Sequence, residues 1–238
     1  MAKSRPSTSS GNGSAGPWVP ETRSTDVLTT RCEGIGPFLA LLYLLRPPNV
    51  ARAYSMTPKN ELPPIVRLIT THNSAGKAIF SDAVRDNPEQ NAIGKGEAMF
   101  ALSYCSEQFP VDMTEDRDIK AYQKYASQPP GLVINSGTVL RHVDMAPSYT
   151  SPMHRTVSLD YGVVLEGDIE LILDSGEKRL MEQGGIAIQR GTMHAWRNTS
   201  HTKWARMLFI LQPAKPLEVA GHRLGEDLET MEGVRSSS

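Results

Sequence analysis

Two short stretches of this chain carry its clearest structural signal: HRTVSLDYGVVLEG at residues 154–167 and QRGTMHAWRN at residues 189–198. On an extended strand, side chains two, four or six residues apart point to the same side. The side chains that share a side in this way are His154, Thr156, Ser158 and Asp160 in the first stretch and His194, Trp196 and Asn198 in the second. We therefore expect two strands that turn these groups toward one interior.

The sequence around these stretches indicates an all-β domain. From Pro64 onward, segments rich in β-branched and aromatic residues alternate with turn signals such as Asp174-Ser175-Gly176-Glu177. Strands are predicted at 65–71, 77–80, 98–105, 137–145, 161–166, 169–174, 178–181, 185–189, 194–198 and 205–212. Helix is predicted only at 117–126 and, more weakly, after Pro216. Many short strands joined by tight turns favour a jelly-roll barrel or a sandwich over a parallel α/β fold.

The first stretch resembles the first motif of the cupin superfamily. In general form that motif reads Gly, five residues, His-x-His, three or four residues, Glu, six residues, Gly. His154 matches its first histidine, Asp160 takes the place of the glutamate, and Gly167 closes it. Thr156 stands where the second histidine is expected.

The second stretch is similar to the second cupin motif, which reads Gly, five residues, Pro-x-Gly, two residues, His, three residues, Asn. Residues 191–198 match the second half position for position, whereas Gln189-Arg190 replaces the proline. The resemblance covers roughly residues 64–213. It implies a cupin-type double-stranded β-helix, a jelly-roll barrel with little helix built around a small-molecule pocket.

In such a barrel the shared side faces the interior, so His154, Asp160 and His194 are expected to converge. Two imidazoles and a carboxylate suit a divalent transition metal, and they leave positions open for substrate, water or oxygen. Fe(II) is the first choice, with Mn(II), Ni(II) and Zn(II) as alternatives. We expect these three residues as metal ligands and His194 and Asp160 also as catalytic groups.

Other interpretations of the same residues stay open. The threonine at position 156 is the best argument for a barrel without metal, because a hydroxyl does not replace imidazole as a strong ligand. Asp160 could instead accept hydrogen bonds from a turn or pair with Arg155 or Arg190, and His154 could be a surface histidine in a loop.

The resemblance also assigns side chains to the walls of a pocket. The expected substrate-pocket residues are Thr156, Tyr161, Gln189, Trp196, Met207 and Phe209. Aromatic and methionine side chains with a few polar groups suit a flat, partly apolar ligand, although each could equally serve core packing. His142, on an earlier predicted strand, could supply a third imidazole or lie partly exposed.

Within the superfamily, both stretches look like a group of small single-domain cupins. In filamentous fungi such proteins often accompany polyketide biosynthetic enzymes and are described as cupin-domain oxidoreductases. The resemblance implies an oxidoreductase that acts on a small aromatic or polyketide-derived intermediate of secondary-metabolite biosynthesis. Two alternatives remain: a metal-assisted or cofactor-free lyase, dehydratase or decarboxylase of the same type of pathway, and a non-catalytic binding barrel.

Composition narrows the range of partners. The 238 residues include 25 Lys and Arg against 26 Asp and Glu, so the chain lacks the positive charge that binds nucleic acid. Cys32 and Cys105 form neither a disulfide framework nor a CxxC pair, which suits the cytosol. The longest apolar run, at 37–45, is far shorter than the roughly 20 residues of a membrane span. We expect a cytoplasmic protein with a small-molecule substrate and neither nucleic-acid nor membrane partners.

The chain is expected to have three parts. Residues 1–55 form a disordered or poorly ordered N-terminal extension, since the first 34 are rich in Ser, Gly, Thr and Pro and show no periodicity. Residues 56–215 form the barrel, and residues 216–238 form a C-terminal tail. A strand at 65–71 would be free to pair with another chain, which predicts a homodimer.

Overall fold

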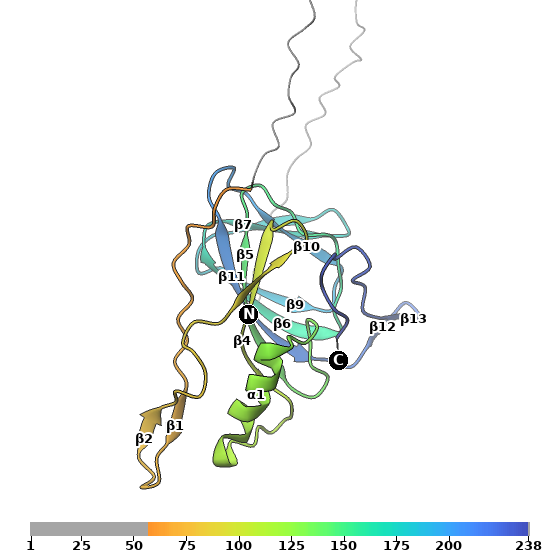
Figure 1. Ribbon diagram of the computed structural model, residues 1–238. Helices are drawn as coiled ribbons and strands as arrows, with labels where there is room; N and C mark the ends of the chain where they lie inside the picture. Colours follow the sequence, from red (N-terminus) through yellow and green to blue (C-terminus); the bar gives the residue numbers. More distant parts are fainter. Residues whose placement is uncertain (1–56, 238) are drawn as a thin grey trace, which may run out of the picture. The chain divides into compact units, whose positions relative to one another are not determined.

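Strand β6 (Ser158–Glu166) shows how the alternation in the sequence becomes a sheet. Its even-numbered residues, Ser158 to Val164, are buried, whereas the residues between them are partly exposed. Gly167 follows with a φ of +79°, a value that favours glycine, and closes the turn into β7 (Ile169–Leu173). The computed structural model describes residues 57–237 (Figure 1), so the predicted extension at 1–55 lies outside the described residues.

Nearly all regular structure in residues 57–237 is strand. The remaining strands are β1 (Thr70–His72), β2 (Ala78–Phe80), β3 (Gln90–Ile93), β4 (Ala98–Ser106), β5 (Thr138–Met145), β8 (Lys178–Met181), β9 (Ile186–Arg190), β10 (His194–Asn198), β11 (Ala205–Pro213), β12 (Leu217–Val219) and β13 (His222–Leu224). A short 3₁₀ turn, η1 (Thr114–Asp116), leads into the helix α1 (Arg117–Ser127). The all-β prediction and the helix predicted at 117–126 are confirmed. No helix within 57–237 has the length and apolar character needed to cross a membrane.

Two antiparallel sheets form the jelly-roll barrel. The larger has the strand order β3-β4-β5-β11-β6-β9, and the smaller has the order β10-β7-β8. Their inward side chains meet in a core that includes Val143, Val164, Ile169 and Met207. Figure 1 shows α1 beside the large sheet, where the Tyr122 hydroxyl donates to the carbonyl of Leu102 at 2.9 Å.

The structure departs from the predicted elements near the first and the last residues of the described chain. Strand β3 was not predicted, because Gln90–Ile93 carries mostly exposed polar side chains and owes its form to pairing with β4. The strand predicted at 65–71 overlaps β1 (Thr70–His72) only at its last two residues, since the backbone of Arg67 instead donates to the carbonyl of Asp86. The predicted helix after Pro216 is absent from the described structure, where the hairpin β12-β13 takes its place.

The C-terminal segment is also part of the fold. Asp227 exchanges two backbone hydrogen bonds with Arg155, at 2.8 and 2.9 Å, and Met231 is buried in the core cluster beside α1. Residues 216–237 were expected to be a tail, but in the structure they return to the barrel and help to cover its interior.

Candidate active site

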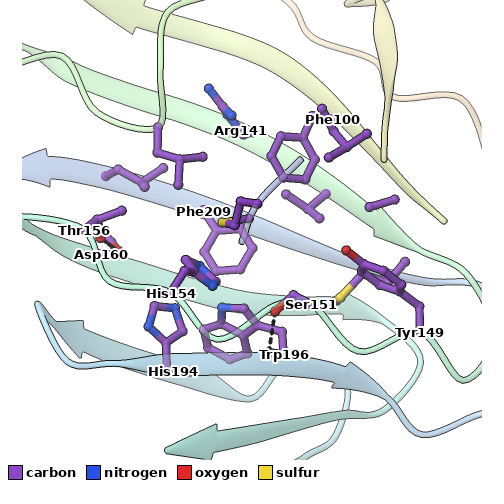
Figure 2. A pocket seen from close by; sticks show the side chains of 17 residues that line it. Phe100, Arg141, Tyr149, Ser151, His154, Thr156, Asp160, His194, Trp196 and Phe209 are labelled. Carbon is purple, nitrogen blue, oxygen red and sulfur yellow. Dashed lines mark hydrogen bonds between the residues drawn. The ribbon is translucent and has the colours of Figure 1, made fainter. Parts of the chain in front are cut away.

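A pair of histidines lies at one end of an interior pocket. His154 lies on the segment that precedes β6, and His194 begins β10. Their backbones exchange two hydrogen bonds of 2.9 Å, which places the two residues directly opposite each other. The imidazole centroids are therefore only 4.3 Å apart (Figure 2).

Both rings are held in the same way by backbone carbonyls. Nδ1 of His154 is 2.9 Å from the carbonyl oxygen of Pro152, and Nδ1 of His194 is 2.9 Å from that of Thr192. A carbonyl oxygen only accepts, so Nδ1 carries the proton and donates it. Nε2 of each neutral ring is thereby left as an acceptor, as in histidines that bind metals.

Burial keeps both imidazoles neutral. It lowers the pKa of His194 to about 3, with the nearby His154 acting in the same direction. Burial also lowers the pKa of His154, against the opposing effect of its hydrogen bond to Pro152. At neutral pH the pair therefore consists of two uncharged bases. The burial of His154 also excludes the alternative that it is a surface histidine in a loop.

A carboxyl group lies in the same pocket. Burial raises the pKa of Asp160 to about 6, although hydrogen bonds from Ser158 and Thr156 oppose the shift. The Thr156 hydroxyl donates to Oδ2 at 3.3 Å, and the Ser158 hydroxyl donates to Thr156 at 2.7 Å. Oδ1 of Asp160 is buried and has no hydrogen-bond partner within the described chain. Within residues 57–237, no ion pair joins Asp160 to Arg155 or Arg190.

The expected three-ligand metal set is not assembled in residues 57–237. No three His, Cys, Asp or Glu side chains in this part of the chain come close enough together to hold a metal ion. The reason lies in the chain between His154 and Asp160. His154 pairs with β10, whereas pairing with β11 and β9 begins only at Ser158 and Leu159, so the same parity does not bring the two side chains to one point.

The donor chemistry nevertheless fits a divalent metal in part. His154 and His194 offer two adjacent neutral Nε2 atoms, and Asp160 offers a carboxylate oxygen without a partner. Imidazole and carboxylate are suitable ligands for first-row divalent ions. Thr156 lines the same pocket and bonds to Asp160, but its hydroxyl adds no strong ligand.

Apolar side chains make most of the pocket wall. Trp196 stacks edge-on against both His194 and Phe209, with ring centroids 5.4 Å apart in each case. The cavity volume of the pocket is about 70 Å³, and the hollow is partly open to solvent. Its other lining residues include Ile93, Ala98, Phe100, Leu132, Val143, Met145, Leu211 and Met231. Such a cavity suits a small, largely apolar molecule.

Three of the expected pocket residues do not line it. Tyr161 alternates with the inward-facing Asp160 and therefore lies on the other face of β6. Met207 is fully buried in the core behind the pocket. Gln189 donates to the carbonyl of Thr192 at 3.1 Å and so supports the turn that holds His194. Thr156, Trp196 and Phe209 do line the pocket.

Sequence reasoning missed other pocket residues. Arg141, Tyr149 and Ser151 lie on the wall together with the apolar residues (Figure 2). The signal for Arg141 was the alternation of β5, in which Arg141, Val143 and Met145 face the pocket. His142 faces the other way, where Nδ1 lies 2.6 Å from the Ser103 hydroxyl, so it supplies no third imidazole to this site.

Comparison with known proteins gives consistent matches. A family model described as cupin domain matches residues 141–211. Phomopsin biosynthesis cluster protein D of Diaporthe leptostromiformis is 48% identical over 159 residues, which cover 67% of this chain and 84% of that protein. Cupin-domain-containing oxidoreductase virC of Hypocrea virens is 43% identical over 156 residues, which cover 65% of this chain and 78% of that protein. Among solved structures, the polyketide cyclase RemF from Streptomyces resistomycificus matches with a TM-score of 0.38 and 16% identity, covering 66% and 89% of the two chains.

Proposed function

This chain belongs to the cupin superfamily, among the cupin-domain proteins of fungal biosynthesis clusters, and from this premise we propose that it is an oxidoreductase. Its substrate in this proposal is a small aromatic or polyketide-derived intermediate. The name of the Hypocrea virens relative supports the reaction class. The observation that carries the proposal is the pair of buried, neutral imidazoles, His154 and His194, at the wall of an apolar pocket.

The proposal includes a divalent transition metal, with Fe(II) as the first choice and Mn(II), Ni(II) or Zn(II) as alternatives. His154 and His194 would hold it through Nε2, because Nδ1 of each ring is engaged by a backbone carbonyl. A third donor would come from a substrate oxygen, because the Asp160 carboxyl group does not converge with the two imidazoles in residues 57–237. When bound, such an ion would supply Lewis acidity and, as iron or manganese, one-electron redox chemistry.

The protein itself would bind and orient the substrate. Trp196 and Phe209 offer ring faces and edges to a planar body, and the apolar wall excludes water from it. Asp160, with a pKa near 6, exists in both protonation states around neutral pH. Its unpartnered Oδ1 is therefore the atom at which a proton would be held or released.

The same carboxyl group favours a second candidate, a lyase, dehydratase or decarboxylase. A carboxyl group with a raised pKa in the same pocket as a neutral imidazole offers an acid and a base and needs no oxidant. In this alternative Asp160 donates a proton and His194 accepts one.

Consumption of an oxidant separates the candidates. Full-length protein, reconstituted anaerobically with Fe(II), is mixed with a panel of aromatic aldehydes and alcohols of the salicylaldehyde type, and dioxygen uptake is recorded with product masses. We expect oxidised product with matching dioxygen uptake, lost in His194→Ala and retained in His142→Gln, whose histidine lies outside the pocket. Loss of water or carbon dioxide without dioxygen uptake would support the lyase instead, and complete recovery of a bound ligand would support a binding barrel.

A further inference from the structure

Arg141 places a guanidinium group in the wall of the apolar pocket. The residue lies on β5, its exposed fraction is 6%, and its side chain lines the same cavity as the histidine pair. In Figure 2, Arg141 and Phe100 lie at one end of the pocket and His154 and His194 at the other, with Phe209 between them. The guanidinium carbon is 5.2 Å from the centroid of the Phe100 ring.

This guanidinium has no counter-charge within the described chain. Its one hydrogen bond there runs from Nη2 to the carbonyl oxygen of Gly131, at 2.9 Å, and its buried Nε has no partner. Burial lowers the pKa of Arg141 to about 10, so the group is still charged at neutral pH. The neighbouring Cys105 cannot balance it, because burial raises the pKa of this thiol to about 12.

The other buried arginine of the barrel shows how the fold normally treats such a charge. Arg206 donates from Nε and Nη2 to both oxygens of Asp144, at 2.6 and 2.7 Å, and from Nη1 to the carbonyl of Pro63. A buried charge without a partner is costly, whereas a paired one is tolerated. The contrast between Arg206 and Arg141 indicates that the partner of Arg141 comes from outside residues 57–237, and the position of Arg141 in the pocket wall points to a bound ligand.

We infer that Arg141 is the anchor for a carboxylate on the substrate, whose apolar or aromatic body fills the pocket between this guanidinium and the histidine pair. The inference rests on the proposed function, since it takes the pocket as the substrate site. A guanidinium presents N–H groups in a fork that matches the two oxygens of a carboxylate. Phe100 and Phe209 then contact the body of the molecule, and the atom that reacts lies toward His154 and His194.

Equilibrium binding of two ligands of the same shape tests this assignment. The probes are 2-naphthoate and its neutral amide, 2-naphthamide, titrated into the full-length protein by calorimetry with EDTA present. Wild-type protein should bind naphthoate on the order of 10- to 100-fold more tightly, as expected for hydrogen bonds to charged groups. Arg141→Met should abolish this preference, while Arg190→Met, which removes an exposed arginine, should retain it.

Thermal unfolding distinguishes a binding role from a structural one. Arg141→Met replaces an unpaired buried charge with an apolar chain, so its Tm should equal or exceed that of the wild type. Should this variant fail to fold, Arg141→Lys keeps a charge but loses the fork, and a reduced preference in it supports the assignment. The inference is overturned if wild-type protein does not prefer the carboxylate, or if the preference persists in Arg141→Met.

The same titration in His194→Ala separates this inference from the proposed function. Because binding is measured without metal or turnover, the preference for naphthoate should survive in this variant even if no metal is ever bound. Conversely, a metal-binding, active protein without the preference would leave the proposed function standing and refute the role of Arg141.

Discussion

The histidine pair depends on backbone pairing as much as on side-chain identity. The two hydrogen bonds exchanged by His154 and His194 fix the strand positions, and the carbonyls of Pro152 and Thr192 fix the rings. Two imidazoles this close, in a buried site, resist protonation because the second positive charge would meet the first. Their protonation state is therefore linked to the stability of the barrel.

This linkage predicts loss of stability in acid. The pKa of His194 is about 3 in the folded protein, against 6.5 in an unfolded chain, so the unfolded state binds more protons between these values. Stability should fall as the pH drops from 6.5 toward 3, by on the order of 2 kcal/mol between pH 6.5 and 5 from this group. The raised pKa of Asp160 acts in the opposite direction between about 4 and 6, but its shift is smaller.

Urea unfolding with EDTA at pH 7 and pH 5 measures this effect. His194→Gln keeps an amide that can reach the carbonyl of Thr192 but does not titrate, so the variant should lose less stability than the wild type over this interval. Equal losses in the two proteins would show that His194 is not held neutral by burial.

At the scale of single residues, the alternation of side chains along the predicted strands identified part of the candidate site. It placed Thr156 and Trp196 at the pocket, where they lie, and the cupin resemblance added Phe209. The alternation wrongly predicted that Asp160 converges with the two histidines. Backbone pairing passes from the small sheet to the large sheet between His154 and Ser158, and a local pattern does not indicate this change. The alternation of β5 also carried a signal for Arg141, but an arginine on a predicted strand is ordinarily interpreted as solvent-exposed.

At the scale of elements, one polar cluster attaches the first described segment to the barrel. Asp144 on β5 accepts four hydrogen bonds: two from Arg206 on β11, one from Asn60 and one from Gln90 on β3. Asp144 is fully buried, so this carboxylate joins three parts of the fold in a site without water access.

Removal of one partner should therefore be strongly destabilising. Asp144→Ala leaves Arg206 buried without its counter-charge, and we expect it to lower the free energy of unfolding by about 3–5 kcal/mol. Chemical denaturation at pH 7 measures the change. Asp112→Ala, which breaks the exposed pair with Arg117, serves as the control and should unfold close to wild type. A similar small effect for both variants would mean that the buried cluster contributes little.

The elements that could be predicted were those with their own apolar pattern. Strand β6 alternates buried and partly exposed residues along nearly its whole length, and β5 does so over its first six positions. Strands β3, β12 and β13 have mostly exposed side chains and form only because a neighbouring segment offers backbone partners. Pairing of that kind depends on tertiary contacts that no local pattern encodes.

For the whole molecule, we propose self-association as a homodimer. Several large apolar side chains are exposed on the segment that leads into the β1-β2 hairpin and on the hairpin itself, including Val66, Leu68 and Phe80, with exposed fractions of 61–69%. Edge strand β9 exposes Ile186 and Ile188 as well. Exposed apolar groups beside unpaired strand edges are typical of surfaces that pair with another chain.

Sedimentation velocity at micromolar concentration tests this proposal. We expect a dimer for the full-length wild type and a shift toward monomer for Val66→Thr/Leu68→Thr, which keeps strand propensity but removes apolar surface. Phe109→Ser, at an exposed position outside the strands, should leave the dimer intact. A wild-type protein that sediments only as monomer would rule out the proposal.

The central claim is that the histidine pair of this cupin barrel holds a divalent transition metal. The most direct measurement is the metal content of the full-length protein, purified without chelator and after anaerobic exposure to Fe(II), determined by elemental analysis. We predict less than one equivalent after purification, because the third donor does not converge with the two imidazoles, and close to one after reconstitution. His154→Ala and His194→Ala should each lose the metal, whereas His142→Gln should keep it. A wild-type protein that takes up no Fe(II), Mn(II), Ni(II) or Zn(II), or uptake that survives both alanine variants, would contradict the account.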